Sequence, residues 1–204
     1  SLSGNVRGAL WMLASAISFT LMTSLIKYLG EDYSAALQTF YRNAAGLVVL
    51  APLILRNPAQ ALSTTRPAIM LYRALAGTIG MVLAFWAYQE LPLAEANALS
   101  FTRTLWIVPL AIFILRERIG PWRMSATIVG FLGVLIMLQP SIANAVGWPA
   151  AAALASALLF ATTITGVTVL TRDHSATLLM VWGSVLRAGF SVPLAVIDAR
   201  WFTP

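Results

Sequence analysis

Long apolar stretches separated by short polar breaks dominate the chain. A helix needs about 20 mostly apolar residues to cross the ~30 Å hydrocarbon core of a bilayer. Stretches of about that length cover residues 8–29, 35–55, 68–89, 93–115, 121–138, 148–170 and 176–197. Each is apolar on all sides, which is typical of helices surrounded by lipid or by one another. The pattern predicts an all-α integral membrane protein with seven transmembrane helices.

Composition supports this interpretation and excludes several others. The chain is 59% hydrophobic and 10% charged, whereas a soluble domain carries about 25% charged residues. The net charge of +6 comes from dispersed residues without a basic cluster, so we expect no nucleic-acid partner. The chain has no cysteine and one histidine, His174, so neither a disulfide nor a zinc site is expected. We expect no metal or cofactor.

The positive charges flanking the predicted helices are distributed unevenly. Cytoplasmic loops of membrane proteins carry an excess of Lys and Arg. With the N-terminus in the cytoplasm, Lys27 and Arg200 fall on the far side. The cytoplasmic side then holds Arg7, Arg56, Arg66, Arg116, Arg118, Arg123 and Arg172. This asymmetry predicts a cytoplasmic N-terminus.

The first two predicted helices resemble the last two when the sequence is shifted by 141 residues. Leu13-Ala14-Ser15-Ala16 aligns with Leu154-Ala155-Ser156-Ala157, and Pro52-Leu53 aligns with Pro193-Leu194. The loops also align, because Asp32, Ser34 and Ala35 match Asp173, Ser175 and Ala176. Five helices separate equivalent points, so the second copy enters the membrane from the opposite side. The sequence therefore predicts an inverted-topology repeat of five-helix units around a central site.

Several short segments, in this order and spacing, resemble the EamA-type transporters of the drug/metabolite transporter superfamily. The segments are Gly8–Trp11 with Lys27, Phe40–Arg42, Leu91–Ala94, Phe113–Arg118 and Gly130–Val134. Members of that family are ten-helix proteins of the bacterial inner membrane that export amino acids and other small metabolites. The resemblance implies that 1–140 form the first five-helix repeat. It also implies that 147–204 form the first two helices of a truncated second repeat, which lacks about three helices.

Arginines deep within predicted helices are the strongest candidates for a binding site. Arg103 lies eleven residues into its helix, ~16 Å at 1.5 Å per residue, and Arg42 and Arg187 are also well inside theirs. A central Arg costs roughly 2.5–3.5 kcal/mol on insertion scales, and no acidic residue lies at similar depth. These arginines predict a wet, positive cavity that binds a carboxylate-bearing small molecule. Hydrogen bonds to helix carbonyls or pairing with acids on missing helices remain alternatives. For Arg73, nearer a helix end, we expect snorkelling.

Other polar and aromatic side chains are grouped around these arginines by helical spacing. We expect the substrate-binding set to comprise Arg42, Arg103, Gln38, Asn43, Asn97, Trp106, Trp86 and Arg187. The many threonines are expected to bond carbonyls of their own helices instead. Gly130 and Gly133 allow close helix approach, and could form a homodimer contact through the fifth helix.

The resulting hypothesis is an inner-membrane exporter of small metabolites such as amino acids, working by alternating access within the lipid bilayer. An anion-selective or small-solute channel is one alternative, and a multidrug exporter of the same fold is another. An intramembrane protease is disfavoured, because His174 is in a loop and no aspartate is buried in a predicted helix. We therefore expect no enzyme.

Overall fold

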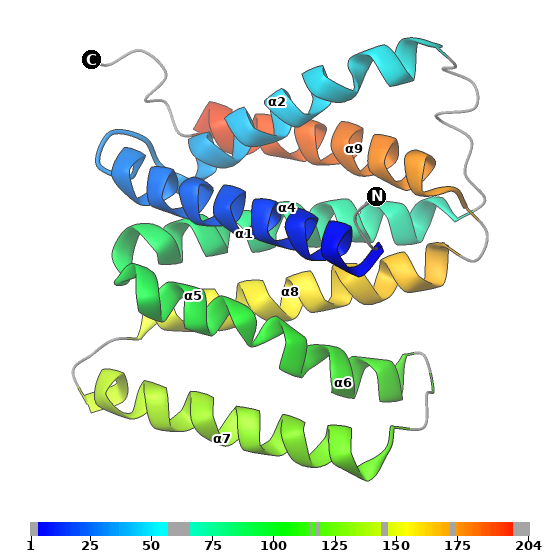
Figure 1. Ribbon diagram of the computed structural model, residues 1–204. Coiled ribbons are helices and arrows are strands. Elements are labelled where there is room, and N and C mark those ends of the chain that lie inside the picture. Colours follow the sequence, from blue (N-terminus) through cyan, green and yellow to red (C-terminus); the bar gives the residue numbers. More distant parts are fainter. Residues whose placement is uncertain are drawn as a thin grey trace.

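The computed structural model describes residues 4–56, 66–114, 116, 119–143, 147–171 and 174–197, and every regular element in these ranges is a helix (Figure 1). The helices are α1 (Gly4–Leu29), α2 (Ala35–Arg56), α4 (Pro67–Glu90), α5 (Leu93–Phe101), α6 (Arg103–Phe113), α7 (Pro121–Ala143), α8 (Trp148–Leu170) and α9 (Ala176–Ile197). All seven predicted helical stretches are therefore confirmed as helical, with one of them divided into α5 and α6.

Five spans in the described residues are long and apolar enough to cross a membrane. They are Gly8–Leu29, Pro67–Glu90, Leu93–Phe113, Trp148–Leu170 and Thr177–Ile197. The chain is thus an all-helical protein with several membrane-spanning helices. Helices α2 and α7 are not among the five, so the count of seven crossings stays a prediction, as does the orientation of the N-terminus.

The fourth predicted span, 93–115, is interrupted at Thr102. The Thr102 hydroxyl donates to the Leu99 carbonyl over 2.6 Å, and the Thr102 amide donates to the same carbonyl over 3.1 Å. A hydroxyl that binds a carbonyl three residues back competes with regular α-helical bonding. Pro109 of the same stretch lies inside helix α6, seven residues after the break. The interruption therefore arises from a threonine.

The centre of the bundle is the pair α4 and α8. Helix α8 packs along α4, and α9 packs against both α2 and α4. At the α4–α8 contact, a Cβ atom placed on Gly80 would lie 3.2 Å from the Cβ atom of Leu159. The absent side chain of Gly80 therefore allows these helices their close approach. Helix α7 packs on α6 at the edge of the bundle (Figure 1).

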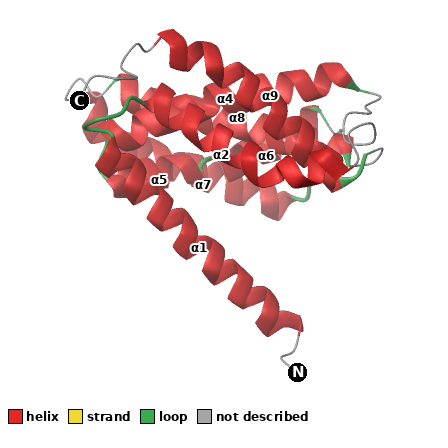
Figure 2. Ribbon diagram, turned by 90° about the horizontal axis from the view of Figure 1, so that it is seen from above, coloured by secondary structure: helices red, strands yellow, loops and turns green. Residues whose placement is uncertain are grey.

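Helix α1 is attached to the bundle near its C-terminal end. Thr23 and Ile26 are buried, whereas the side chains from Trp11 to Ser18 are all exposed. Figure 2 shows the N-terminal part of α1 pointing away from the other helices. The C-terminal part of α1 therefore positions any site formed with α2 and α4.

Lys27 ties this end of α1 to the end of α4. Its ammonium donates to the carbonyl oxygens of Leu91 at 2.7 Å and Gln89 at 3.3 Å. Carbonyls at a helix C-terminus lack helical hydrogen-bond partners and carry partial negative charge. A cationic donor there supplies the hydrogen bonds and also offsets the charge. Gln89 also reaches back, since its side-chain amide donates to the Tyr33 carbonyl over 3.2 Å.

We expect Lys27→Met to destabilise the protein by ~1–2 kcal/mol, because it leaves two carbonyls without their charged donor. Thermal unfolding of the purified protein in detergent measures this as a lower Tm. Tyr28→Met is the matched control, because Tyr28 is the neighbouring residue and is 76% exposed. Equal Tm values for the two variants would contradict this role of Lys27.

The turns after α1 and α8 have the same local geometry. The amide of Tyr33 donates to the Leu29 carbonyl over 2.8 Å, and the amide of His174 donates to the Leu170 carbonyl over 3.0 Å. The next helices begin alike: the hydroxyl of Ser34 accepts from the Leu37 amide at 3.2 Å, and that of Ser175 accepts from the Leu178 amide at 3.3 Å. Both serines satisfy free amides at a helix start.

Candidate functional site

A groove of about 700 Å³ between α1, α2 and α4 could hold a ligand. Its volume lies within the ~300–1,000 Å³ of typical small-molecule sites. Most of the lining is apolar and comes from one side of α1. The lining residues are Ser18, Leu21, Met22, Leu25, Ile26, Leu29, Tyr33, Gln38, Tyr41, Arg42 and Phe85. We refer to this feature as the α1–α2 groove.

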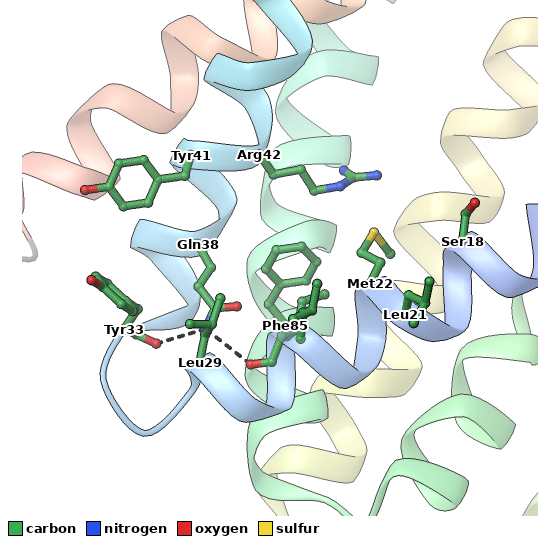
Figure 3. A pocket seen from close by; sticks show the side chains of 11 residues that line it. Ser18, Leu21, Met22, Leu29, Tyr33, Gln38, Tyr41, Arg42 and Phe85 are labelled. Atoms are coloured by element: carbon green, nitrogen blue, oxygen red, sulfur yellow. Dashed lines mark hydrogen bonds between the residues drawn. The ribbon is translucent and has the colours of Figure 1, made fainter.

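Arg42 provides the positive charge of the α1–α2 groove. Figure 3 shows its side chain extending from α2 toward Met22 and Ser18 of α1, whereas Tyr41 points the other way. One guanidinium nitrogen donates to the sulfur of Met81 over 3.0 Å. In the described part of the chain, no carboxylate lies within ion-pair distance of Arg42. Its remaining donors are available to an anionic or carbonyl-bearing ligand.

Gln38 lines the same groove, but its amide group has a structural role. The side-chain nitrogen donates to the carbonyls of Ile26 and Tyr33, both over 3.2 Å (Figure 3). These bonds join α2 to the end of α1 and to the loop between them. Gln38 therefore shapes the groove at the end opposite the free part of α1.

Asn43 and Arg187 lie on the other side of α2. The side-chain amide of Asn43 donates to the backbone carbonyl of Arg187 over 3.4 Å, which links α2 to α9. The Arg187 side chain shares a small cavity with Arg73 of α4. Arg73 donates from Nε to the carbonyl of Thr163 in α8 over 3.3 Å, so its side chain packs between α4 and α8, and the expected snorkelling stays a prediction.

Asn97 and Arg103 lie around Tyr88, outside the α1–α2 groove. The Tyr88 hydroxyl donates to Asn97 Oδ1 over 3.2 Å and also lies 3.2 Å from the Ser100 hydroxyl, which can donate to it. Arg103 begins α6 directly after the break at Thr102, and its positive charge acts on Tyr88. Arg42 and Arg103, which the sequence treats as one carboxylate-binding pair, therefore belong to two separate polar groups.

The two tryptophans of the expected set also lie outside the groove. Trp86 is half-buried and packs against the apolar core between α1, α4, α5 and α8. Trp106 of α6 meets Phe131 of α7 edge-to-face, with ring centroids 4.9 Å apart. The indole nitrogen of Trp106 is buried and has no hydrogen-bond partner in the described residues.

The threonines behave as expected, because their hydroxyls bond carbonyls of their own helices. Examples are Thr20 to Ala16, Thr39 to Ala35 and Thr165 to Ala161, at 2.8–3.0 Å. Of the glycines in α7, Gly130 faces α6, since a Cβ atom there would lie 2.5 Å from Leu105 Cδ2, whereas Gly133 has nothing within 4 Å. The homodimer through this helix stays a prediction.

Most of the groove lining lies outside the set of residues expected from the sequence. Tyr33, Tyr41 and Phe85 are ordinary aromatic positions by sequence, and Met22 and Ser18 sit among many similar residues. A usable signal was the spacing along α1, where Ser18, Leu21, Met22, Leu25, Ile26 and Leu29 recur every three or four residues on one side. In the described residues, no group of three His, Cys, Asp or Glu side chains could hold a metal ion.

These features define a multi-pass helical membrane protein with a large apolar groove that contains a guanidinium group. The family model of the EamA-like transporter family matches residues 6–139. The chain belongs to this family. This finding confirms the resemblance stated above, and the names of the family and of similar proteins indicate transport rather than catalysis.

Three similar proteins illustrate the range of the family. The chain is 30% identical over 200 residues to a riboflavin transporter of Rhizobium johnstonii, covering 92% of this chain and 66% of that protein. It is 32% identical over 135 residues to an S-adenosylmethionine uptake transporter of Rickettsia prowazekii, covering 66% of this chain and 46% of that protein. It is 28% identical over 133 residues to a pseudopaline exporter of Pseudomonas aeruginosa, covering 65% and 46% respectively.

The chain spans about two thirds of the length of the riboflavin transporter and less than half of the other two proteins. No solved structure matches the chain significantly.

Proposed function

We propose that the chain forms the substrate-binding part of a carrier of small metabolites in the bacterial inner membrane, with its N-terminus in the cytoplasm. The observation that carries this proposal is Arg42, a guanidinium without a carboxylate partner in the described residues, in an apolar groove of about 700 Å³. A cation within a membrane-spanning segment is costly without a partner. A substrate with an anionic group on an apolar body satisfies both the charge and the lining.

The groove favours a particular kind of substrate. Its walls are formed by Leu, Ile, Met and aromatic side chains, and its volume exceeds what a small amino acid requires. We therefore favour larger amphipathic metabolites and, among amino acids, those with aromatic or long apolar side chains. The direction of transport is proposed to be export, although one similar protein is an uptake transporter and another an exporter.

Alternating access is proposed to use an inverted repeat. Three observations support this proposal. First, the pairs α1–α2 and α8–α9 share turn and cap geometry at positions 141 residues apart. Equivalent helices α2 and α9 pack against each other. In Figure 1, α2 and α9 run in opposite directions, as the inverted orientation requires. Two equivalent halves of opposite orientation can exchange conformations, so that a central site opens to each side in turn.

The test is transport by the full-length protein in proteoliposomes, with labelled aromatic amino acids, riboflavin, S-adenosylmethionine and a cationic drug compared. We expect saturable flux of at least one compound that carries a carboxylate on a largely apolar body, such as an aromatic amino acid, accelerated by the same unlabelled compound on the opposite side. Such counter-exchange is typical of a carrier. Flux that does not saturate, with ohmic single-channel currents, would indicate the channel alternative instead. Transport of the cationic drug alone would indicate a multidrug exporter and contradict the role proposed for Arg42.

A further inference from the structure

A second cavity lies between α4, α8 and α9, separate from the α1–α2 groove. It leaves about 10 Å³ for the centre of a water-sized sphere to move in, so its occupied volume exceeds the single sphere that one water molecule needs. Its lining consists of Met70, Arg73, Ala74, Thr163, Trp182, Gly183 and Arg187. Arg73 and Trp182 are both six residues into their helices, ~9 Å from the ends where α4 and α9 begin. We refer to it as the two-arginine cavity.

The polar groups that line this cavity are almost all hydrogen-bond donors. The indole nitrogen of Trp182 is buried and has no partner in the described residues. Indole and guanidinium groups donate but cannot accept. The Thr163 hydroxyl donates to the Leu159 carbonyl of its own helix over 2.9 Å. An unpaired buried donor costs free energy, so the orphaned indole indicates an acceptor that is not part of the described chain.

Hydrogen bonds to helix carbonyls hold the two arginine side chains at this cavity. Each uses its Nε atom on a helix carbonyl: Arg73 on Thr163 at 3.3 Å and Arg187 on Gly183 at 2.8 Å. Both lie against glycines. A Cβ atom on Gly166 would lie 2.9 Å from Arg73 Cδ, and one on Gly183 would lie 3.2 Å from Arg187 Nη2. Glycine at these two positions leaves room for the arginine side chains.

The positive charges at the cavity repel one another, so a negatively charged ligand would be stabilised there. The charge of Arg187 acts repulsively on both Arg73 and Arg42. No carboxylate in the described residues lies within ion-pair distance of either cavity arginine. A water molecule could accept hydrogen bonds there, but it would not neutralise two like charges in a medium of low dielectric constant.

We propose that the two-arginine cavity binds a single monatomic anion of the size of chloride, held by the Trp182 indole N–H and the guanidinium groups of Arg73 and Arg187. The volume admits one small ion and excludes the carboxylate of a metabolite, which is bonded to a larger body. The cavity is therefore an ion site distinct from the proposed substrate site. A bound anion would also screen Arg187 from Arg42 and so reduce the positive potential at the α1–α2 groove.

The test uses the purified full-length protein and bromide as the probe. Tm is measured as bromide replaces gluconate at constant ionic strength, which keeps general salt effects similar. We expect a saturable rise of Tm with bromide. Trp182→Phe removes one donor to the anion and should weaken the apparent affinity for bromide about tenfold or more, and Arg187→Gln should abolish the bromide-dependent rise.

Trp106→Phe is the matched control, because Trp106 is also a buried indole without a partner in the described residues but has no arginine pair around it. It should retain the bromide response of the unmodified protein. Arg42→Gln should keep a saturable bromide-dependent rise of Tm, with only the shift in apparent affinity that loss of its charge causes, because Arg42 does not line this cavity. The proposal is overturned if bromide has no saturable effect, in which case the cavity holds water only. It is equally overturned if Trp182→Phe and Trp106→Phe respond alike.

Discussion

Replacing Arg42 by glutamine is expected to reduce transport of an anionic substrate by about 10- to 100-fold. This range corresponds to the ~1.5–3 kcal/mol of a hydrogen bond to a charged group. The protein should remain folded, because the Arg42 side chain is exposed to the groove and its one described partner is the sulfur of Met81. Initial rates of uptake into proteoliposomes measure the effect, and thermal unfolding checks that the variant is folded.

Arg103→Gln is the informative comparison, because the sequence assigns Arg42 and Arg103 the same role. The structure places Arg42 in the α1–α2 groove and Arg103 near Tyr88. We therefore expect the loss for Arg103→Gln to be several-fold smaller. Equal losses would favour the pair of carboxylate-binding arginines expected from the sequence. Arg42→Lys should recover part of the activity, since it keeps the charge but loses the bidentate geometry.

Replacing Gly80 by leucine is expected to destabilise the protein by ~1–3 kcal/mol or to prevent its folding, because overpacking forces well-packed elements apart. The Cβ atom alone would lie 3.2 Å from Leu159 Cβ and 3.6 Å from the Ser156 carbonyl oxygen. The backbone and the first side-chain atom of α8 cannot rotate away. The contact joins α4 to α8, on which the rest of the bundle is built. Yield of folded protein and Tm in detergent measure the effect.

Gly46→Leu is the matched control for Gly80→Leu. Gly46 also lies inside a helix, α2, but a Cβ atom there has nothing within 4 Å. Both substitutions replace glycine by a better helix former, so their local effect on helix propensity is similar. The control should fold with an unchanged or higher Tm. If both variants lost stability to the same degree, the close approach of α4 and α8 would not explain the result.

Helix positions could be predicted from sequence because each helix satisfies its own backbone. A run of about 20 apolar residues in a membrane has no other way to pair its amides and carbonyls. The predicted ends agree with the structure to within a few residues at α4, α8 and α9. The break at Thr102 was missed, because a threonine hydroxyl can bond either the third or the fourth preceding carbonyl, and local sequence does not decide between them.

The candidate site could be predicted only in part. Two members of the expected set, Arg42 and Gln38, line the α1–α2 groove. They could be predicted because polar residues deep in an apolar helix are conspicuous in the sequence. Position along a helix does not indicate which side of the helix faces the groove. The other six expected residues therefore lie outside the groove lining. The packing of the Arg73 side chain against Gly166 of α8 was likewise not evident from its place along α4.

The sequence alone determined the class of the protein, the helices and the chemical character of its binding groups, because these follow from apolar length, charge and residue type along one segment. It also supplied the 141-residue correspondence on which the proposed repeat rests. The tertiary structure decided which arginines share a cavity, which side of α1 lines the groove and which donors lack partners. These depend on the rotation and packing of helices far apart in sequence, such as α4, α8 and α9. Such packing is set by small residues and side-chain shape at each contact, which no single segment contains.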